Sequence, residues 1–292
     1  MSTHEERLRR PSPIRSLELG DLKVTYVPDG VVRLKPYGWL PGTTERDWSD
    51  NAAYLDDTGN LVASIGGLLV EHGERALLID AGVGPLSQPD DPGNPRIGAI
   101  GGGDLLDNLA KLGRRPEEIE AVAFTHLHLD HIGWAWHPAP GSDRPAFTGA
   151  DYLFAEPEWD QRHLSNEQGT TNEMLAGLAP HVRTVREGEE IFPGVRVLLT
   201  PGHTAGHTTY MITSGDRRLI AFGDALHTSA QIRHPDWSAA PDLDSAESTV
   251  HRHRLVKELM RPDTIGFGGH FADVVFGRVD DTADGPIWVP VA

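Results

Sequence analysis

The fold of this chain is decided by residues 121–131, AVAFTHLHLDH, where an apolar run leads into three histidines and an aspartate. A short apolar run bounded by polar residues is typical of a strand that is buried on both faces. Neutral imidazole nitrogen and carboxylate oxygen are the usual ligands of zinc and similar divalent ions. The four side chains of this type are His126, His128, Asp130 and His131. We therefore predict a metal site at the end of a buried strand, in preference to a solvated loop that merely contains several histidines.

The spacing of these four residues indicates more than one ion. Side chains two residues apart on a strand share a face, so His126 and His128 can approach one ion together. Asp130 and His131 follow the strand, where the chain can turn and direct them towards a second ion.

Three further apolar runs each lead to a side chain of the same kind: residues 195–199 to His203, residues 219–222 to Asp224, and residues 264–267 to His270. Taken singly these motifs are weak, because Pro-Gly-His and Gly-Asp mostly mark turns. Their shared position after apolar strands makes the set specific, since a rigid sheet can direct side chains from several strand ends into one cleft.

The pattern His-x-His-x-Asp-His at residues 126–131 resembles the signature of the metallo-β-lactamase superfamily. The resemblance covers about residues 21–292 and implies an α/β fold, an αββα sandwich of two mixed β-sheets flanked by helices. It also implies a ligand set: His126, His128 and His203 for one ion, Asp130, His131 and His270 for the other, and Asp224 as a bridge between them.

Asp80, at the end of the apolar run 75–79, resembles the first motif of the superfamily, whose aspartate orients a ligand histidine instead of binding the ion. An aspartate that only opens a turn is the alternative. His207 and His227 lie close in sequence to predicted ligands, and we expect them either to orient a ligand or to line the pocket.

A hydrolytic mechanism follows from the resemblance. Two ions at such a site share a hydroxide and lower its pKa enough to make it a nucleophile near neutrality. The same ions polarise the scissile carbonyl or phosphoryl oxygen. We predict Asp130, Asp224 and His227 as the catalytic residues, with Asp130 handing a proton to the leaving group as the resemblance implies. The expected cofactors are two divalent ions, zinc in the first place, with manganese, iron or cobalt as alternatives.

The motifs PGHTAGH at 201–207 and GDALH at 223–227, with the long N-terminal segment, look most like the branch that holds methyl parathion hydrolase and related lactonases. The best-known acyl-homoserine lactonases carry a tyrosine three residues after the bridging aspartate, where this chain has His227. True β-lactamases of the superfamily usually lack that aspartate, and a glyoxalase-type thioesterase would need a basic C-terminal segment, which residues 274–292 do not supply.

We therefore predict a dinuclear metal-dependent hydrolase that cleaves a lactone or carboxylic ester, with phosphotriester cleavage as a side activity. The alternatives are a thioesterase similar to glyoxalase II and a non-catalytic metal-binding domain. The expected partner is a small ester or lactone substrate, and a homodimer is left open.

Composition narrows the class of protein. The 292 residues carry a net charge of −17, which weighs against nucleic acid as a partner, and there is no cysteine to bind a metal. No apolar run approaches the ~20 residues that cross a bilayer, and none resembles a secretory signal, so we expect no membrane partner and a cytoplasmic location. Residues 1–20 are predicted to be a flexible arm before a single domain, residues 21–292.

The wall of the pocket is harder to predict. Five tryptophans near the motifs are candidates for an apolar wall: Trp39, Trp48, Trp134, Trp136 and Trp159. Residues 156–180 read as a mainly helical insertion, which either covers the site or decorates the surface.

Overall fold

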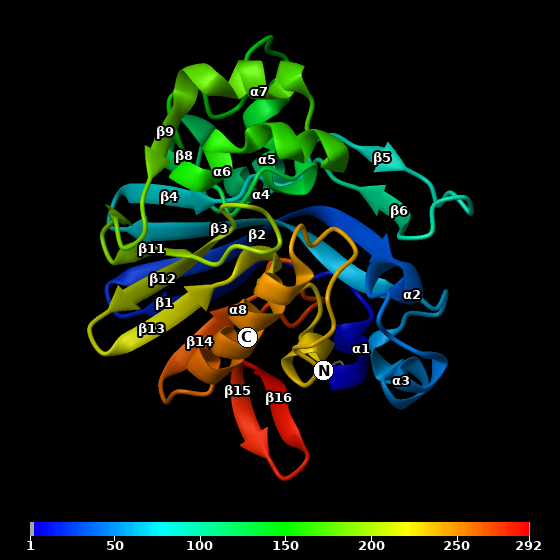
Figure 1. Ribbon diagram of the computed structural model, residues 1–292. Helices are drawn as coiled ribbons and strands as arrows, with labels where there is room; N and C mark the ends of the chain where they lie inside the picture. The colour runs from blue at the N-terminus through cyan, green and yellow to red at the C-terminus, as the bar shows by residue number, and fades with distance from the viewer. Residues whose placement is uncertain (1–2, 292) are drawn as a thin grey trace.

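Two β-sheets pack face to face, with most helices on their outer sides, in the computed structural model, which describes residues 3–291 (Figure 1). The core between the sheets is apolar. Tyr26 and Leu68 of the first sheet belong to the same buried cluster as Tyr210 and Leu219 of the second. The predicted αββα sandwich is therefore confirmed.

The first sheet is mixed and has the strand order β5-β6-β2-β3-β4-β7-β8-β9, with β1 paired to β2 off this path. The pairs from β4 to β9 are parallel and the others antiparallel. Its strands are β1 (Arg15–Leu19), β2 (Leu22–Leu34), β3 (Leu61–His72), β4 (Arg75–Ile79), β5 (Ser87–Gln88), β6 (Ile97–Gly101), β7 (Ala121–Ala123), β8 (Asp151–Ala155) and β9 (Val182–Val185).

The second sheet follows the chain order from β10 to β16, with one parallel pair, β13 and β14. The helix α8 (Ser245–Leu259) forms the crossover between these two strands and packs on β14 and β15. The strands are β10 (Glu190–Phe192), β11 (Val195–Leu199), β12 (Thr208–Ser214), β13 (Arg217–Ala221), β14 (Thr264–Phe267), β15 (Phe276–Thr282) and β16 (Gly285–Pro290).

Four helices lie on the outer side of the first sheet (Figure 1): α4 (Leu105–Lys111), α5 (Leu129–Trp136), α6 (Glu156–Asp160) and α7 (Asn172–Leu178). They bury apolar residues such as Leu109, Ile132 and Leu175 in one cluster with Phe124 and Tyr152. The short helices α2 (Pro36–Trp39) and α3 (Glu45–Asp50) lie in the irregular segment between β2 and β3.

The ends of the two sheets meet where β7 stops. The Tyr210 hydroxyl of β12 donates a hydrogen bond of 2.7 Å to the carbonyl of Phe124, and the Thr208 N–H donates one of 2.8 Å to the carbonyl of Thr125. The loop that begins at Thr125 is therefore held against the second sheet. The candidate ligands that the sequence predicts after strand ends all lie at this edge.

The N-terminal segment has defined contacts with the body of the protein. Residues 4–8 form α1 (His4–Leu8), and β1 pairs antiparallel with β2. Leu19 is fully buried in the core between the sheets. The flexibility predicted for residues 1–20 stays a prediction. The pairing of β1 with β2 and the burial of Leu19 are contacts that would restrict such motion. None of the helices within residues 3–291 is long and apolar enough to cross a membrane.

Candidate metal centre

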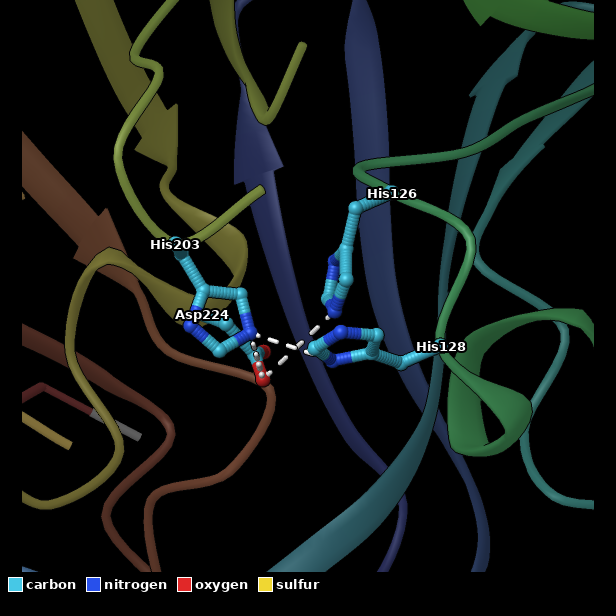
Figure 2. Close-up of side chains that lie close together, drawn as sticks. All are labelled: His126, His128, His203 and Asp224. Carbon is cyan, nitrogen blue, oxygen red and sulfur yellow. Dashed lines mark hydrogen bonds and ion pairs between the residues drawn. The ribbon is translucent and has the colours of Figure 1, made fainter. Parts of the chain in front are cut away.

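The predicted ligands converge from strand ends on one edge of the sandwich. They form two adjoining groups, and within each group one candidate ligand atom per residue lies within 4.8 Å of the others. The first group is His126, His128, His203 and Asp224, which point towards one another in Figure 2. The second group is Asp130, His131 and His270.

Asp224, although a member of the first group, lies between the histidines of the two groups and presents one oxygen to each set. Its Oδ1 is 3.2 Å from Nε2 of His131 and 3.2 Å from Nε2 of His270. Its Oδ2 is 3.4 Å from Nε2 of His203 and 3.8 Å from Nε2 of His126. This is the arrangement that a carboxylate shared by two cations would adopt.

The arrangement of the candidate donor atoms is better explained by bound divalent cations than by hydrogen bonds among the side chains themselves. Nε2 of His126 and Oδ1 of Asp224 are buried without a hydrogen-bond partner among residues 3–291, and such atoms are rare unless a ligand or ion satisfies them. Imidazole nitrogens also face each other, with Nε2 of His203 at 3.2 Å from Nδ1 of His128. Nitrogen and carboxylate oxygen are the donors that zinc takes. The residues therefore fit two divalent cations.

The electrostatics differ between the two groups. Burial is the main effect that lowers the pKa values of His126 and His128 well below the ordinary range, so both rings are neutral as a metal ligand must be. Burial also acts to lower the pKa of His270, but the charges of Asp224 and Asp130 together raise it to about 9. A cation bound by the second group would take the place of that proton.

Three of the candidate ligand histidines are oriented through their Nδ1 atoms. Nδ1 of His131 lies 2.9 Å from Oδ2 of Asp80, which is the contact that the sequence predicted for an orienting aspartate. Nδ1 of His203 lies 2.9 Å from Oδ1 of Asp242, and Nδ1 of His270 lies 2.8 Å from the carbonyl of Ser64. Partners of this kind select the tautomer and raise the basicity of the ligand.

Sequence reasoning missed Asp242 and its buried partner Arg252. Nη1 of Arg252 donates to Oδ2 of Asp242 at 3.0 Å, and both side chains are fully buried. Asp242 follows no apolar strand, and Arg252 stands in a run of basic residues that is typical of a solvated helix face. No local pattern singled out either residue.

His207 and His227 have separate positions. Nε2 of His207 accepts the backbone N–H of Asp224 at 3.0 Å, so this ring holds the loop that carries the shared carboxylate. His227 is 1% exposed and lines the pocket, with its Nε2 at 3.2 Å from Oδ2 of Asp224. Neither Nδ1 nor Nε2 of this ring has a hydrogen-bond partner among the described residues.

A cavity of about 350 Å³ opens directly above the candidate ligands. Its floor includes His128, Asp130, Asp224, His227 and His270. Its walls combine two kinds of side chain. The apolar ones are Val32, Leu34, Trp39, Val83, Leu86, Ile97 and Ile100, and the polar ones are Gln88, Asp91, Asn94, Arg96, Glu167 and Gln168.

The predicted aromatic wall is wrong for four of the five tryptophans, since only Trp39 lines this cavity. Trp48 is buried against Trp237, and Trp134 is buried with its Nε1 donating to Asp29 at 2.7 Å. The remaining two pack on neighbouring elements, Trp136 against Gly177 and Trp159 against Phe154. Periodicity does not distinguish a tryptophan that anchors a helix from one that lines a pocket.

The insertion at 156–180 covers part of the site. Residues from α6 and the 3₁₀ segment η3 (Arg162–Gln168) line a second cavity of about 260 Å³. This cavity lies beside His128 and His203, and both cavities are lined by His128. Of the two readings of this segment, the covering one agrees with the structure.

Comparisons with known proteins identify the family of this chain and several relatives. The family model of the metallo-beta-lactamase superfamily matches residues 68–270. An N-acyl homoserine lactonase of Bacillus cereus is 25% identical over 215 residues, covering 69% of this chain and 79% of that protein. The N-acyl homoserine lactonase AiiA of Bacillus thuringiensis subsp. kurstaki is 27% identical over 169 residues, covering 57% of this chain and 61% of that protein.

Solved structures share the fold over nearly the whole chain. AidC, described as a dizinc quorum-quenching lactonase, has a TM-score of 0.79 at 23% identity, covering 96% of this chain and 98% of that chain. The hydrolase AbOPH has a TM-score of 0.80 at 20% identity, covering 97% of this chain and 99% of that chain. With the family model spanning residues 68–270 and the ligand-type side chains in place, the chain belongs to the metallo-β-lactamase superfamily and is a metal-dependent hydrolase.

Proposed function

We propose that this chain is a dinuclear hydrolase that opens a lactone or cleaves a carboxylic ester. The observation that carries the proposal is the position of Asp224, whose two oxygens face two adjoining sets of candidate ligands at the floor of a partly apolar cavity. The N-acyl homoserine lactonases among the relatives support the lactone as first choice.

The ligand roles proposed are those of the superfamily. His126, His128 and His203 would hold one ion, with Asp130, His131 and His270 holding the other and Asp224 bridging them. Zinc is the first choice of metal, because the donor set is nitrogen and carboxylate oxygen without sulfur. Two such ions, when bound, supply Lewis acidity at the scissile carbonyl and lower the pKa of water.

We assign proton transfer to Asp130 and binding of a substrate oxygen to His227. Asp130 is the most exposed of the candidate ligands, with 26% of its side chain exposed, and lines the cavity floor. It can therefore pass a proton to the leaving alcohol while the substrate is bound. His227 lines the cavity and neither of its ring nitrogens has a hydrogen-bond partner within residues 3–291, so we propose that this ring holds an oxygen of the substrate.

Substrate polarity follows from the cavity walls and the charge of the protein. The apolar part of the wall, which includes Val32, Trp39 and Ile100, binds an acyl or aryl group through buried area, at roughly 25 cal/mol per Å². A net charge of −17 disfavours anionic substrates within about a Debye length, 8–10 Å in ordinary buffers. We therefore expect uncharged lactones or aryl esters with an apolar tail to be preferred over phosphodiesters.

An activity screen tests the proposal. Zinc-loaded and manganese-loaded protein would be assayed against lactones of increasing acyl length, aryl esters, thioesters and phosphotriesters, with Asp224→Ala as the matched inactive variant. The expected result is the highest kcat/KM for a lactone or ester with an apolar tail. A preference for thioesters would support the glyoxalase-like alternative, and no turnover of any class by protein loaded with two ions would support the non-catalytic one.

A further inference from the structure

Glu158 is not a candidate ligand, yet its carboxylate joins the two loops that carry the histidines of the first group. Oε1 accepts the N–H of Leu127 at 2.8 Å, and Leu127 separates His126 from His128. Oε2 accepts the Thr204 hydroxyl at 2.7 Å and the N–H of Gly206 at 2.9 Å, in the loop that begins at His203. One buried side chain thus ties together chain segments that are far apart in the sequence.

The same insertion holds Leu127 from its other side. The hydroxyl of Thr170 donates to the carbonyl of Leu127 at 2.6 Å, and this side chain is fully buried. The N–H and the carbonyl of Leu127 belong to different peptide planes. Glu158 and Thr170 therefore restrain both planes between the two histidines.

The contact between the insertion and the second loop is close. A Cβ atom at Gly206 would lie 2.1 Å from the backbone nitrogen of Glu158, so this position accepts only glycine without displacement of α6. Burying a carboxylate is costly unless it is hydrogen-bonded. Glu158 is 5% exposed, and no ion pair with it is found among residues 3–291, so its three hydrogen bonds to the two loops provide the compensation.

We propose that Glu158 and Thr170 form a clamp that positions the first ligand group and sets its affinity for a divalent ion. The clamp rests on the ligand roles assigned under the proposed function. Its effect is selective, because the second group is held by other contacts. His131 is held by Asp80, and His270 is held by the carbonyl of Ser64.

The test compares Glu158→Gln with Glu156→Gln. Glu156 begins the same helix but is exposed and pairs with Arg186 at 3.0 Å on the surface, so it controls for the loss of one carboxylate. Metal-free protein would be titrated with cobalt(II) and zinc in competition with a chromophoric chelator, and the cobalt absorption bands would report the geometry of each ion. We expect Glu158→Gln to weaken one ion on the order of tenfold to hundredfold, the range found for partners that orient ligands. Glu156→Gln should leave both ions unchanged.

Assignment of the weakened ion comes from His203→Ala, which removes a ligand of the first group only. The cobalt bands lost in His203→Ala should be the ones altered in Glu158→Gln. Should Glu158→Gln fail to fold, Thr170→Val retains the shape of the side chain and removes one hydrogen bond, and it should weaken the same ion by a smaller factor.

Unchanged stepwise affinities in folded Glu158→Gln or Thr170→Val would overturn the clamp, as would equal weakening of both ions. Wild-type protein that binds fewer than two ions would instead overturn the metal assignment itself. The two failures are therefore distinguishable.

Discussion

The buried carboxylate of Asp273 offers the sharpest test of how the N-terminal segment is held. Asp273 is fully buried three residues after His270, and arginines from the N-terminal segment converge on it. Oδ2 accepts from Arg10 at 2.6 Å and Oδ1 from Arg15 at 2.6 Å, while Arg7 donates to its backbone carbonyl at 2.7 Å. We predict that Asp273→Asn destabilises the protein and frees the segment.

The magnitude follows from the exposure of the partners. Removing one member of a fully buried ion pair costs about 3–5 kcal/mol. The arginine side chains here are 20–46% exposed, so water recovers part of their solvation. The amide oxygen of asparagine also retains one neutral hydrogen bond. We therefore expect a loss at the lower end, about 3 kcal/mol, which is about 5 °C in Tm for a chain of 292 residues.

The assay is thermal unfolding followed by circular dichroism, together with limited trypsin digestion. Asp280→Asn is the matched control, because Asp280 is an exposed carboxylate on β15. In Asp273→Asn, cleavage after Arg7, Arg9 and Arg15 should become faster than cleavage elsewhere, whereas the bond after Arg10 resists trypsin because Pro11 follows it. If the variant melts within about 0.5 kcal/mol of wild type with the same digestion pattern, the cluster does not hold the segment and the flexible arm predicted from sequence is right.

Three further predictions concern the candidate site. Asp224→Ala should abolish turnover and weaken the binding of both ions, whereas His227→Ala should retain both ions and lose on the order of hundredfold in kcat. Elemental analysis and steady-state kinetics would test this prediction, and loss of metal from His227→Ala would contradict the role assigned to His227. Trp39→Ala should raise KM for substrates with apolar tails about tenfold, since about 60 Å² of lost contact is worth about 1.5 kcal/mol. The buried Trp134→Ala should instead lower stability by about 3–5 kcal/mol, and equal KM effects from both variants would refute the cavity assignment. Chelation of the ions should lower the free energy of unfolding by about 2.7 kcal/mol per ion where free metal had been 100 times its Kd, measured by denaturant titration; an unchanged midpoint would mean that no ion is bound in the folded state.

Much of the site could be predicted because its signals are local. Each candidate ligand lies within a few residues of the end of an apolar run, and a buried strand shows itself by composition alone. His126 and His128 share a face through the two-residue period of a strand, so their pairing needs no knowledge of the rest of the chain. The architecture was implied by the resemblance of these motifs to the metallo-β-lactamase superfamily, because apolar runs by themselves do not specify how many sheets form or how they pack.

The supporting contacts could not be predicted, because they join residues with no regular spacing between them. Glu158 reaches Leu127 from 31 residues away and Gly206 from 48, and Arg7 reaches Asp273 from 266. A buried glutamate on a short polar helix has the same composition as a solvated one, and only the packing of the helix against the two loops distinguishes them. The sequence by itself therefore determined which side chains can bind metal and on which strands they are carried. The tertiary structure alone decided which polar side chains lose their contact with water, and it is this burial that turns Glu158, Asp242 and Asp273 into parts of the framework around the site.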